Sequence, residues 1–389
     1  MKFLFMDWMA TFRCVGGECP MTCCGNWNIG LLDEDIQGYK KLAEQHSFGK
    51  EIWKAVDEER HCMRQCDGRC QMLTEDGWCR IVLECGEEYL SGTCTTFPRK
   101  VKQFGDIMEC MVEIVCPLVA ERVFDDKKIE FMVGDIEPEA DDTIDDALDM
   151  ELYDTLSLGR TFLIELFQKY DFTYSAAKLY IMFQAIRAVQ EMYGNHQLHR
   201  DTMERWLQRW DDGNCAAVYE SLVSITGRTE LKAVKLLEFL DKLIAIDAME
   251  YLVCDVKDNT LEEDFQRWIR DRKGFEEEIK GYTKYFTEHY PLAFENFFIF
   301  MLFREWIPVK LEMGKFGESF MIRVVVWCLI QLCAMSVWNR KGEVTPKEYA
   351  MIVAGFDRIS AHSTVIFDEL VRVLKEEDNI AILLLYLIC

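Results

Sequence analysis

The first third of the chain holds most of the side chains that could bind a metal. Twelve of the seventeen cysteines fall within the first 116 residues of the 389-residue chain. They are Cys14, Cys19, Cys23, Cys24, Cys62, Cys66, Cys70, Cys79, Cys85, Cys94, Cys110 and Cys116. Cysteines that serve only as small apolar side chains would be scattered along the chain. Thiols gathered at short spacings can instead converge on one centre, and thiolates select zinc, copper(I) and iron–sulfur clusters.

A disulfide framework is the main structural alternative for these cysteines. It requires an oxidising compartment. The apolar start of the chain is interrupted at Asp7, before it is long enough for a signal-peptide core. The odd number of cysteines and the adjacent pair Cys23 and Cys24 also disfavour regular bridging. We therefore expect reduced thiols and a cytoplasmic protein.

The spacings do not match the simplest metal motifs. The N-terminal region contains no C-x2-C pair, which is typical of structural zinc sites. Cys62, Cys66 and Cys70 come close to the C-x3-C-x2-C motif of radical S-adenosylmethionine enzymes, but the second interval is too long. We expect an iron–sulfur cluster on at least four thiolates, [4Fe–4S] being favoured and all-thiolate zinc being the alternative. Since Cys23 and Cys24 are adjacent, their side chains can serve different partners.

The charge of the chain restricts its partners. The formal net charge is −24, which disfavours binding to nucleic acid or to anionic membranes and favours a basic partner. Residues 135–154 carry ten acidic side chains and no basic one. Such a run indicates a solvated connector, and attraction of a basic substrate is the functional alternative. The apolar stretch 324–338 is too short to cross a bilayer, so we expect a buried core helix there.

The periodicity of apolar residues predicts a mainly α fold. Helical spacing appears in 33–59, where Asp33 is expected to cap the helix, and along most of the chain after residue 152, including 231–246 and 292–306. We expect an irregular cysteine-rich N-terminal metal-binding domain packed on a helical C-terminal bundle, against which the apolar end 380–389 docks. The predicted domains are 1–125 (cysteine-rich, with a helical insert), 126–155 (acidic connector) and 156–389 (helical).

Four segments resemble the flagellin lysine-N-methylase family. They are FRCVGGECPMTCCGNW at 12–27, the block 70–99, CPLVAER at 116–122 and FENFFIFMLFREWIP at 294–308. The resemblance implies methyl transfer from S-adenosylmethionine to a lysine Nε of a flagellin-like surface protein. The sequence itself shows no G-x-G-x-x-G loop and no β/α alternation, so it does not predict a Rossmann-type donor site.

The resemblance also selects candidate site residues. Eight cysteines stand at family positions and are the predicted metal ligands: Cys14, Cys19, Cys23, Cys24, Cys70, Cys79, Cys94 and Cys116. The polar candidates in the matching segments are Glu88, Tyr89 and Glu295 for catalysis and Asn296, Arg304 and Arg99 for cofactor binding, with Glu305 beside them. An internal Glu–Arg pair within 294–306 is the structural alternative, because charges in so apolar a helix should be paired.

A second class of function uses the same cysteines. A non-catalytic metal- or cluster-binding sensor or interaction module would need no pocket for a methyl donor, and a zinc-stapled interaction protein would contain zinc and no iron. Binding of S-adenosylmethionine separates the enzyme from both. The oligomeric state is open at this point.

Overall fold

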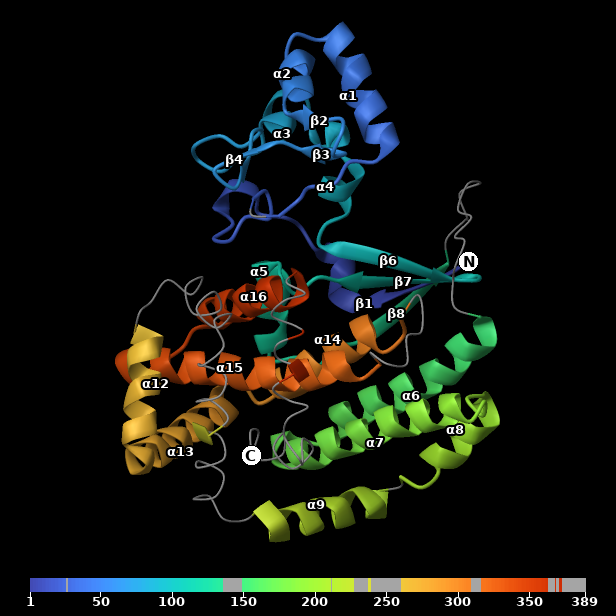
Figure 1. The fold of residues 1–389 in the computed structure, drawn as a ribbon, viewed down its shortest axis with the longest axis vertical. Helices are drawn as coiled ribbons and strands as arrows, with labels where there is room; N and C mark the ends of the chain where they lie inside the picture. Colours follow the sequence, from blue (N-terminus) through green and yellow to red (C-terminus); the bar gives the residue numbers. More distant parts are fainter. Residues whose placement is uncertain are drawn as a thin grey trace. The chain divides into compact units, whose positions relative to one another are not determined.

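The computed structural model describes most of the chain. The described residues are 1–25, 27–135, 149–210, 212–226, 237–238, 260–308, 316–362, 368 and 371–372. Most of the acidic connector, all of the predicted helix 231–246 except residues 237–238, and the end 380–389 lie outside them. The predicted mainly α fold is confirmed, with small sheets in addition (Figure 1).

The chain divides into two compact units. The cysteine-rich unit comprises Trp8–Lys100 and Val112–Val119. The helical unit comprises Met1–Asp7, Val101–Met111 and Ala120–Cys389. All eight predicted metal ligands belong to the cysteine-rich unit, so the thiol chemistry is confined to one compact body.

The cysteine-rich unit is built from short elements joined by turns. They are η1 (Asp7–Thr11), η2 (Gly16–Glu18), α1 (Asp33–Gln45), α2 (Gly49–Lys54), β2 (Val56–Asp57), β3 (Cys62–Met63), β4 (Gln65–Cys66), β5 (Arg69–Cys70), α3 (Arg80–Glu84), η3 (Glu87–Tyr89), α4 (Gly92–Thr96) and the start of α5 (Pro117–Glu121). Strands β2 and β3 form one antiparallel pair, and β4 and β5 form another. Such short strands cannot form a stable sheet alone, so the unit depends on its side-chain core.

The predicted helical insert is present as two helices, and one detail of it was wrong. Asp33 is the first residue of α1, and Leu32 occupies the N-cap position. The N-cap amide is bound by the first turn of the helix, since the Leu32 N–H donates to Asp35 Oδ2 at 2.8 Å. The other oxygen of Asp35 accepts from Gly92 N at 2.9 Å, which ties α1 to the start of α4.

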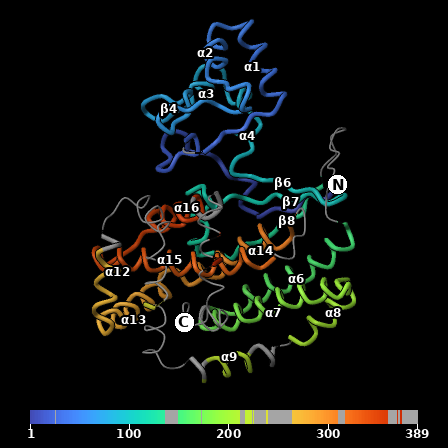
Figure 2. Tube along the Cα trace, viewed as in Figure 1, coloured from blue at the N-terminus to red at the C-terminus, as the bar shows by residue number. Residues whose placement is uncertain are grey.

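A four-stranded sheet in the helical unit does not appear among the sequence predictions. Its strands are β1 (Lys2–Met6), β6 (Arg99–Phe104), β7 (Ile107–Val112) and β8 (Phe131–Asp135), in the order β6-β7-β1-β8. Figure 2 shows the N-terminal strand between β7 and β8. It runs parallel to β7 and antiparallel to β8. This is no doubly wound parallel sheet, in line with the missing Rossmann signature in the described part of the chain.

The helices of the helical unit surround a strongly apolar centre. They are η4 (Arg122–Phe124), α6 (Met150–Lys169), η5 (Phe172–Tyr174), α7 (Ser175–Gly194), α8 (Arg200–Leu207), α9 (Asp212–Thr226), α12 (Thr260–Arg270), α13 (Arg272–His289), α14 (Ala293–Glu305), α15 (Glu318–Lys341) and α16 (Pro346–His362). Helix α14 packs against α6, α15 and η4, and α15 packs against α13 and α16. Every residue from Ala293 to Phe303 is buried, so α14 is the core helix of this unit.

Helix α15 contains the apolar stretch 324–338. Among the described residues it is the one helix whose length and composition could span a membrane. In the structure 83% of its most apolar window is buried inside the protein. The prediction of a buried core helix is therefore confirmed.

Candidate functional site

Four cysteines from separate segments line one small apolar pocket in the cysteine-rich unit. We call Cys24, Cys70, Cys79 and Cys94 the pocket set. The remaining lining residues are Ile29, Tyr39, Met63, Met72, Leu73, Ile81 and Leu90. Cys70 belongs to the apolar core cluster of this unit, and Cys24, Cys79 and Cys94 pack against that cluster.

A close approach of two backbone segments brings two of these thiols together. The Cys70 N–H donates to Cys24 O at 2.8 Å, and Gly25 bridges to Arg69. A Cβ on Gly25 would lie 2.5 Å from Gly68 O, well inside van der Waals contact. Glycine at position 25 is therefore required for the two segments to come this close.

Short helices position the other two members of the pocket set. Cys79 directly precedes α3, and the backbone N–H groups of Ile81 and Val82 face its sulfur. Cys94 lies in α4, whose first turn is capped by Ser91: the hydroxyl oxygen accepts from Cys94 N at 3.3 Å. Amide groups at a helix N-terminus favour a thiolate over a thiol, which suits a metal ligand.

Burial makes the thiols of Cys70, Cys79 and Cys94 hard to ionise in the absence of a bound cation. Burial raises the pKa of Cys70 to about 12 and the pKa of Cys94 to about 11, and it raises the pKa of Cys79 as well. The neighbouring thiols add to the effect, because several thiolates in one apolar space repel one another. A bound cation reverses this preference, since a coordinating thiol is deprotonated outright.

The other four family cysteines form a second group, which we call the loop set: Cys14, Cys19, Cys23 and Cys116. Cys14 and Cys116 lie within electrostatic range of Cys23, and Cys19 and Cys14 lie within range of Cys116. Backbone donors face two of the sulfurs. Gly16 N lies 3.3 Å from Cys14 Sγ, and the N–H groups of Leu118 and Val119 face Cys116 at the start of α5.

The adjacent cysteines interact directly through their side chains. The Cys23 thiol donates a hydrogen bond to Cys24, which lowers the pKa of Cys24 to about 6 and raises the pKa of Cys23. Of the two sulfurs, that of Cys24 is therefore the more readily ionised. The Trp27 indole N–H donates to Cys23 O, and the centroid of the Trp27 ring lies 5.8 Å from that of Phe97. Trp27 therefore packs beside the cysteines.

The four cysteines outside the family pattern lie elsewhere. Cys62 is buried on β3, Cys66 is exposed in β4, Cys85 follows α3, and Cys110 is on β7 in the helical unit. None of them lines the pocket of the pocket set. Of the four, Cys85 packs against the same apolar core cluster without lining the pocket.

The donor type of the pocket set is the one that soft metals and iron–sulfur clusters take. In the described ranges, no group of three or more His, Cys, Asp or Glu side chains is arranged to hold one metal ion. A mononuclear zinc site needs its sulfurs about 2.3 Å from a common point. In a [4Fe–4S] cluster each cysteine binds a different iron, so the sulfurs stand farther apart. Both kinds of centre take four thiolates, and the pocket set supplies four thiols around one apolar space.

The predicted polar candidates of the cysteine-rich unit lie at its surface. Glu88 and Tyr89 are exposed in η3, and the next residue, Leu90, lines the pocket of the pocket set. Arg99 is half-buried; its guanidinium lies 5.2 Å from the ring of Phe12, and its Nη2 donates to Phe12 O at 3.4 Å. Glu88 and Tyr89 are therefore open to a large substrate.

Glu295 and Asn296 lie in the core of the helical unit. The Glu295 carboxylate pairs with Lys178, whose ammonium also donates to Tyr170 O at 3.0 Å and lies 5.3 Å from the ring of Phe294. Burial raises the pKa of Glu295, and the charge of Lys178 opposes that rise. The Asn296 amide donates to two backbone carbonyl groups, at 3.3 and 3.1 Å.

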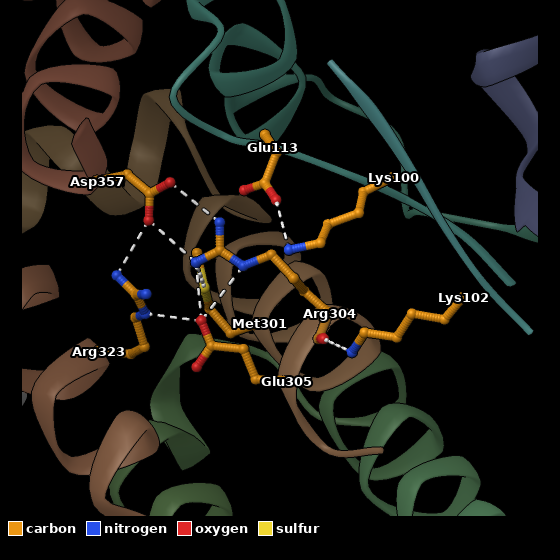
Figure 3. A network of polar contacts seen from close by, with 8 residues as sticks. All are labelled: Lys100, Lys102, Glu113, Met301, Arg304, Glu305, Arg323 and Asp357. Atoms are coloured by element: carbon orange, nitrogen blue, oxygen red, sulfur yellow. Dashed lines mark hydrogen bonds and ion pairs between the residues drawn. The ribbon is translucent and has the colours of Figure 1, made fainter. Parts of the chain in front are cut away.

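Arg304 and Glu305 belong to a buried network of charges (Figure 3). Arg304 donates to Glu305 at 2.8 Å and to both oxygens of Asp357 at 3.0 Å. Arg323 donates to the same two carboxylates, at 2.9 and 3.0 Å. Two cations and two anions thus balance, and they join α14, α15 and α16. Burial alone would raise the pKa of Glu305, but Arg323 and Arg304 outweigh it and hold the pKa below its ordinary value.

The sequence predictions did not include two partners of this network or a second buried charge group. Arg323 and Asp357 are the two partners. Like Glu305, each is a charged residue within an apolar helical stretch, so the same pattern in the sequence could have identified them. The second group centres on Glu109 in β7, which accepts from Arg160 at 2.8 Å and from the Tyr153 hydroxyl at 2.7 Å. Glu109 within the apolar run MECMV is the matching signal.

Comparison with known proteins agrees with the resemblance seen in the sequence. The lysine-N-methylase of Salmonella typhimurium is 26% identical over 127 residues, which is 30% of this chain and 30% of that protein. The flagellar biosynthetic protein FliU of Salmonella muenchen is 25% identical over 127 residues, 30% of this chain and 72% of FliU. The aligned part thus spans less than a third of the curated methylase. No solved structure matches. Residues 160–386 match the family described as the FliB lysine N-methylase C-terminal domain, and the chain therefore belongs to that family.

Proposed function

We propose that this protein is a cytoplasmic, S-adenosylmethionine-dependent protein-lysine N-methyltransferase that acts on a flagellin-like protein and carries a thiolate-bound iron–sulfur cluster. The observation that carries the proposal is the family match over 160–386, together with relatives named lysine-N-methylase. The name of FliU supports a flagellar substrate. The net charge of −24 favours an acceptor segment with positive charge around the target lysine.

The reaction requires a neutral amine and a place for one proton. The lone pair of the lysine Nε forms a bond to the methyl carbon while the carbon–sulfur bond of the donor breaks and S-adenosylhomocysteine leaves. The methylated amine then releases a proton to a base or to water. Glu88 and Tyr89 are the candidates that support this step best, because both are exposed in η3, which directly precedes the pocket-lining residue Leu90.

The pocket set would hold the cluster. When bound, a [4Fe–4S] group would supply a structural cross-link among four segments of the cysteine-rich unit. Backbone amides facing Cys79 and the Ser91 cap at Cys94 orient two of the sulfurs, and the apolar lining excludes water. This role requires no further assumption about the methyl donor.

Methyl transfer can be measured directly. The protein, purified without oxygen and with its full metal content, is incubated with methyl-labelled S-adenosylmethionine and flagellins from several flagellated bacteria. We expect label in at least one flagellin and none with metal-stripped protein. Calorimetric titration with S-adenosylmethionine runs in parallel, because a non-catalytic cluster-binding module predicts no donor binding. Metallated protein that neither binds the donor nor labels any acceptor would contradict the proposal.

A further inference from the structure

Two helices of the helical unit border a hollow that is lined mainly by polar side chains. The hollow lies between α7 and α8 and has a volume of about 380 Å³. Many of its lining residues lie three or four positions apart, as on one face of a helix: Gln184, Arg187 and Glu191 on α7, and Thr202, Arg205 and Arg209 on and just after α8. Helix faces that pack on one another are normally apolar. Packing therefore does not account for the polar residues found here.

The surrounding structure holds both walls of the hollow in place. Helix α8 packs against α6, where the ring of Trp206 lies edge-on to that of Phe162 with 6.4 Å between the centroids. The turn that follows α7 is tied back to this helix, since the Gln197 N–H donates to Met192 O at 2.7 Å. His196 in the same turn has a φ of 55°, in the left-handed region, and there the chain turns toward α8. The hollow is thus a part of the folded structure.

The charge of the lining is opposite to the charge of the chain. The chain has 68 acidic and 44 basic side chains, whereas the described residues that line the hollow include three arginines and one carboxylate. These are Arg187, Arg205, Arg209 and Glu191. Arg187 and Arg205 form no ion pair with any described residue, and Nε of Arg205 donates to the Asp201 carbonyl oxygen at 3.2 Å. At least two guanidinium groups of the lining are therefore available to an anion.

A buried tryptophan adds a further hydrogen-bond donor to the lining. Trp206 is 9% exposed and lines the hollow. Its indole N–H donates to no described residue, and the nitrogen is not enclosed as those of Trp8 and Trp210 are. An indole N–H group and a guanidinium group can donate hydrogen bonds but cannot accept them. The available groups of the lining therefore require a ligand that is rich in acceptor oxygens.

We propose that the hollow between α7 and α8 binds a small phosphate-bearing molecule. The planar guanidinium group matches the oxygens of a phosphate and forms charge-assisted hydrogen bonds with them. A phosphomonoester carries a charge of about −1.5 to −2 at neutral pH and has three strong acceptor oxygens, which is more than a carboxylate supplies. The volume of the hollow lies within the range of small-molecule sites, roughly 300–1,000 Å³. The net charge of −24 disfavours a nucleic acid as the source of the phosphate.

Calorimetric titration of the full chain separates the ligands that such a hollow could take. Inorganic phosphate, AMP, adenosine and hexaglutamate are titrated in turn at low ionic strength. We expect AMP and inorganic phosphate to bind and adenosine not to bind, because the phosphate group is what the arginines recognise. Tighter binding of AMP assigns the hollow to organic phosphates, and equal affinities assign it to inorganic phosphate. Absence of binding by both phosphates, equal binding of adenosine and AMP, or binding of hexaglutamate in their place would overturn the proposal.

Matched arginine variants show whether the phosphate binds in this hollow. Arg187→Gln and Arg205→Gln each remove one exposed guanidinium group, and we expect each to raise the Kd for AMP about tenfold. Arg200→Gln is the control and should keep the wild-type Kd, because Arg200 pairs with Glu204 on α8 and does not line the hollow. Wild-type affinity in both Arg187→Gln and Arg205→Gln would place the binding elsewhere and overturn the proposal. The inference does not rest on methyl transfer, so failure of the proposed function leaves it standing.

Discussion

At the residue scale, charge balance decides which side chains are free to do chemistry. Glu295, Arg304 and Glu305 are committed to buried ion pairs with Lys178, Arg323 and Asp357. Removing one member of such a pair leaves an uncompensated buried charge, which is costly. Glu88 and Tyr89 face solvent and carry no comparable constraint.

The two acidic residues of η3 offer a matched test of the catalytic base. Glu87 and Glu88 are both exposed in the same short turn. If Glu88 accepts the proton, Glu88→Gln should lower the rate of methyl transfer by roughly 10²–10⁴-fold, whereas Glu87→Gln should leave it near the wild-type rate. Rates come from labelled-methyl incorporation at saturating donor. Equal rates in the two variants would remove Glu88 from the mechanism.

Breaking the buried Lys178–Glu295 pair should lower the stability of the protein. Lys178→Met leaves the Glu295 carboxylate buried without its cation, and we expect a loss of about 3–5 kcal/mol in the free energy of unfolding. The double variant Lys178→Met/Glu295→Leu should recover most of that loss, since both charges are gone. Arg200→Ala, in the exposed pair with Glu204, is the control and should cost about 0.5 kcal/mol or less. Urea unfolding measures the free energy of unfolding of all three variants. If Lys178→Met unfolds with the same free energy as the wild type, Lys178 and Glu295 do not form a buried ion pair.

At the element scale, the thiol pocket depends on how closely short segments approach one another. Few residues of the cysteine-rich unit lie in long helices or strands, so its segments are positioned by turns, caps and glycines. The contact between 23–25 and 68–70 places Cys24 and Cys70 on one pocket. This contact is the element-scale feature on which the site most depends.

A glycine substitution tests that contact against a neutral site. Gly25→Ala puts a Cβ 2.5 Å from a backbone oxygen that cannot move easily, whereas nothing lies within 4 Å of a Cβ added at Gly30. We expect Gly25→Ala to lower both the metal content per chain and the melting temperature, because the segments bearing Cys24 and Cys70 must separate. Gly30→Ala should retain wild-type metal content. Full metal content in Gly25→Ala would show that the close approach is dispensable.

The sequence predicted the elements whose pattern is local and missed those that depend on distant partners. Helical periodicity identifies α14 and α15 because each buries a long apolar run. The sheet was missed because β1 is only five residues long and pairs with strands about a hundred residues away in the chain. The family resemblance selected eight cysteines as predicted ligands, but it could not say that Cys24, Cys70, Cys79 and Cys94 line one pocket, which depends on how distant segments pack.

At the scale of the whole molecule, two electrostatic features act in different ways. The Arg304–Glu305–Arg323–Asp357 network joins three helices inside the helical unit, where solvent and salt screen it little. The net charge of −24 is a property of the surface and is screened by salt. The buried network should govern stability at low pH. The surface charge should govern the encounter with the substrate.

The buried network predicts a specific dependence of stability on pH. Despite its burial, Glu305 has a pKa below its ordinary value because Arg323 and Arg304 face it. Its contribution is therefore complete above the unfolded pKa and is lost as the pH falls through the lowered folded pKa. Between about pH 5 and pH 3, we expect the melting temperature of the wild type to fall more steeply than that of Glu305→Gln. Parallel pH profiles would contradict this account of the network.

The surface charge predicts that salt weakens recognition of a basic acceptor. Raising the salt from about 0.1 M to 1 M shortens the screening length from about 10 Å to about 3 Å. The KM for a flagellin-like protein with a basic patch should therefore rise several-fold, while kcat stays nearly constant. A neutral lysine peptide is the control, and its KM should change little. A KM for the basic acceptor that does not depend on salt would exclude electrostatic steering.

The most direct test of the central claim locates the transferred methyl group. Fully metallated protein, isotopically labelled S-adenosylmethionine and an unmethylated flagellin are incubated together, and the flagellin is digested and sequenced by mass spectrometry. We predict labelled methyl groups on lysine Nε atoms, in an amount that depends on time and on the enzyme. Label that is absent, or present only on other residue types, would contradict the assignment as a protein-lysine N-methyltransferase.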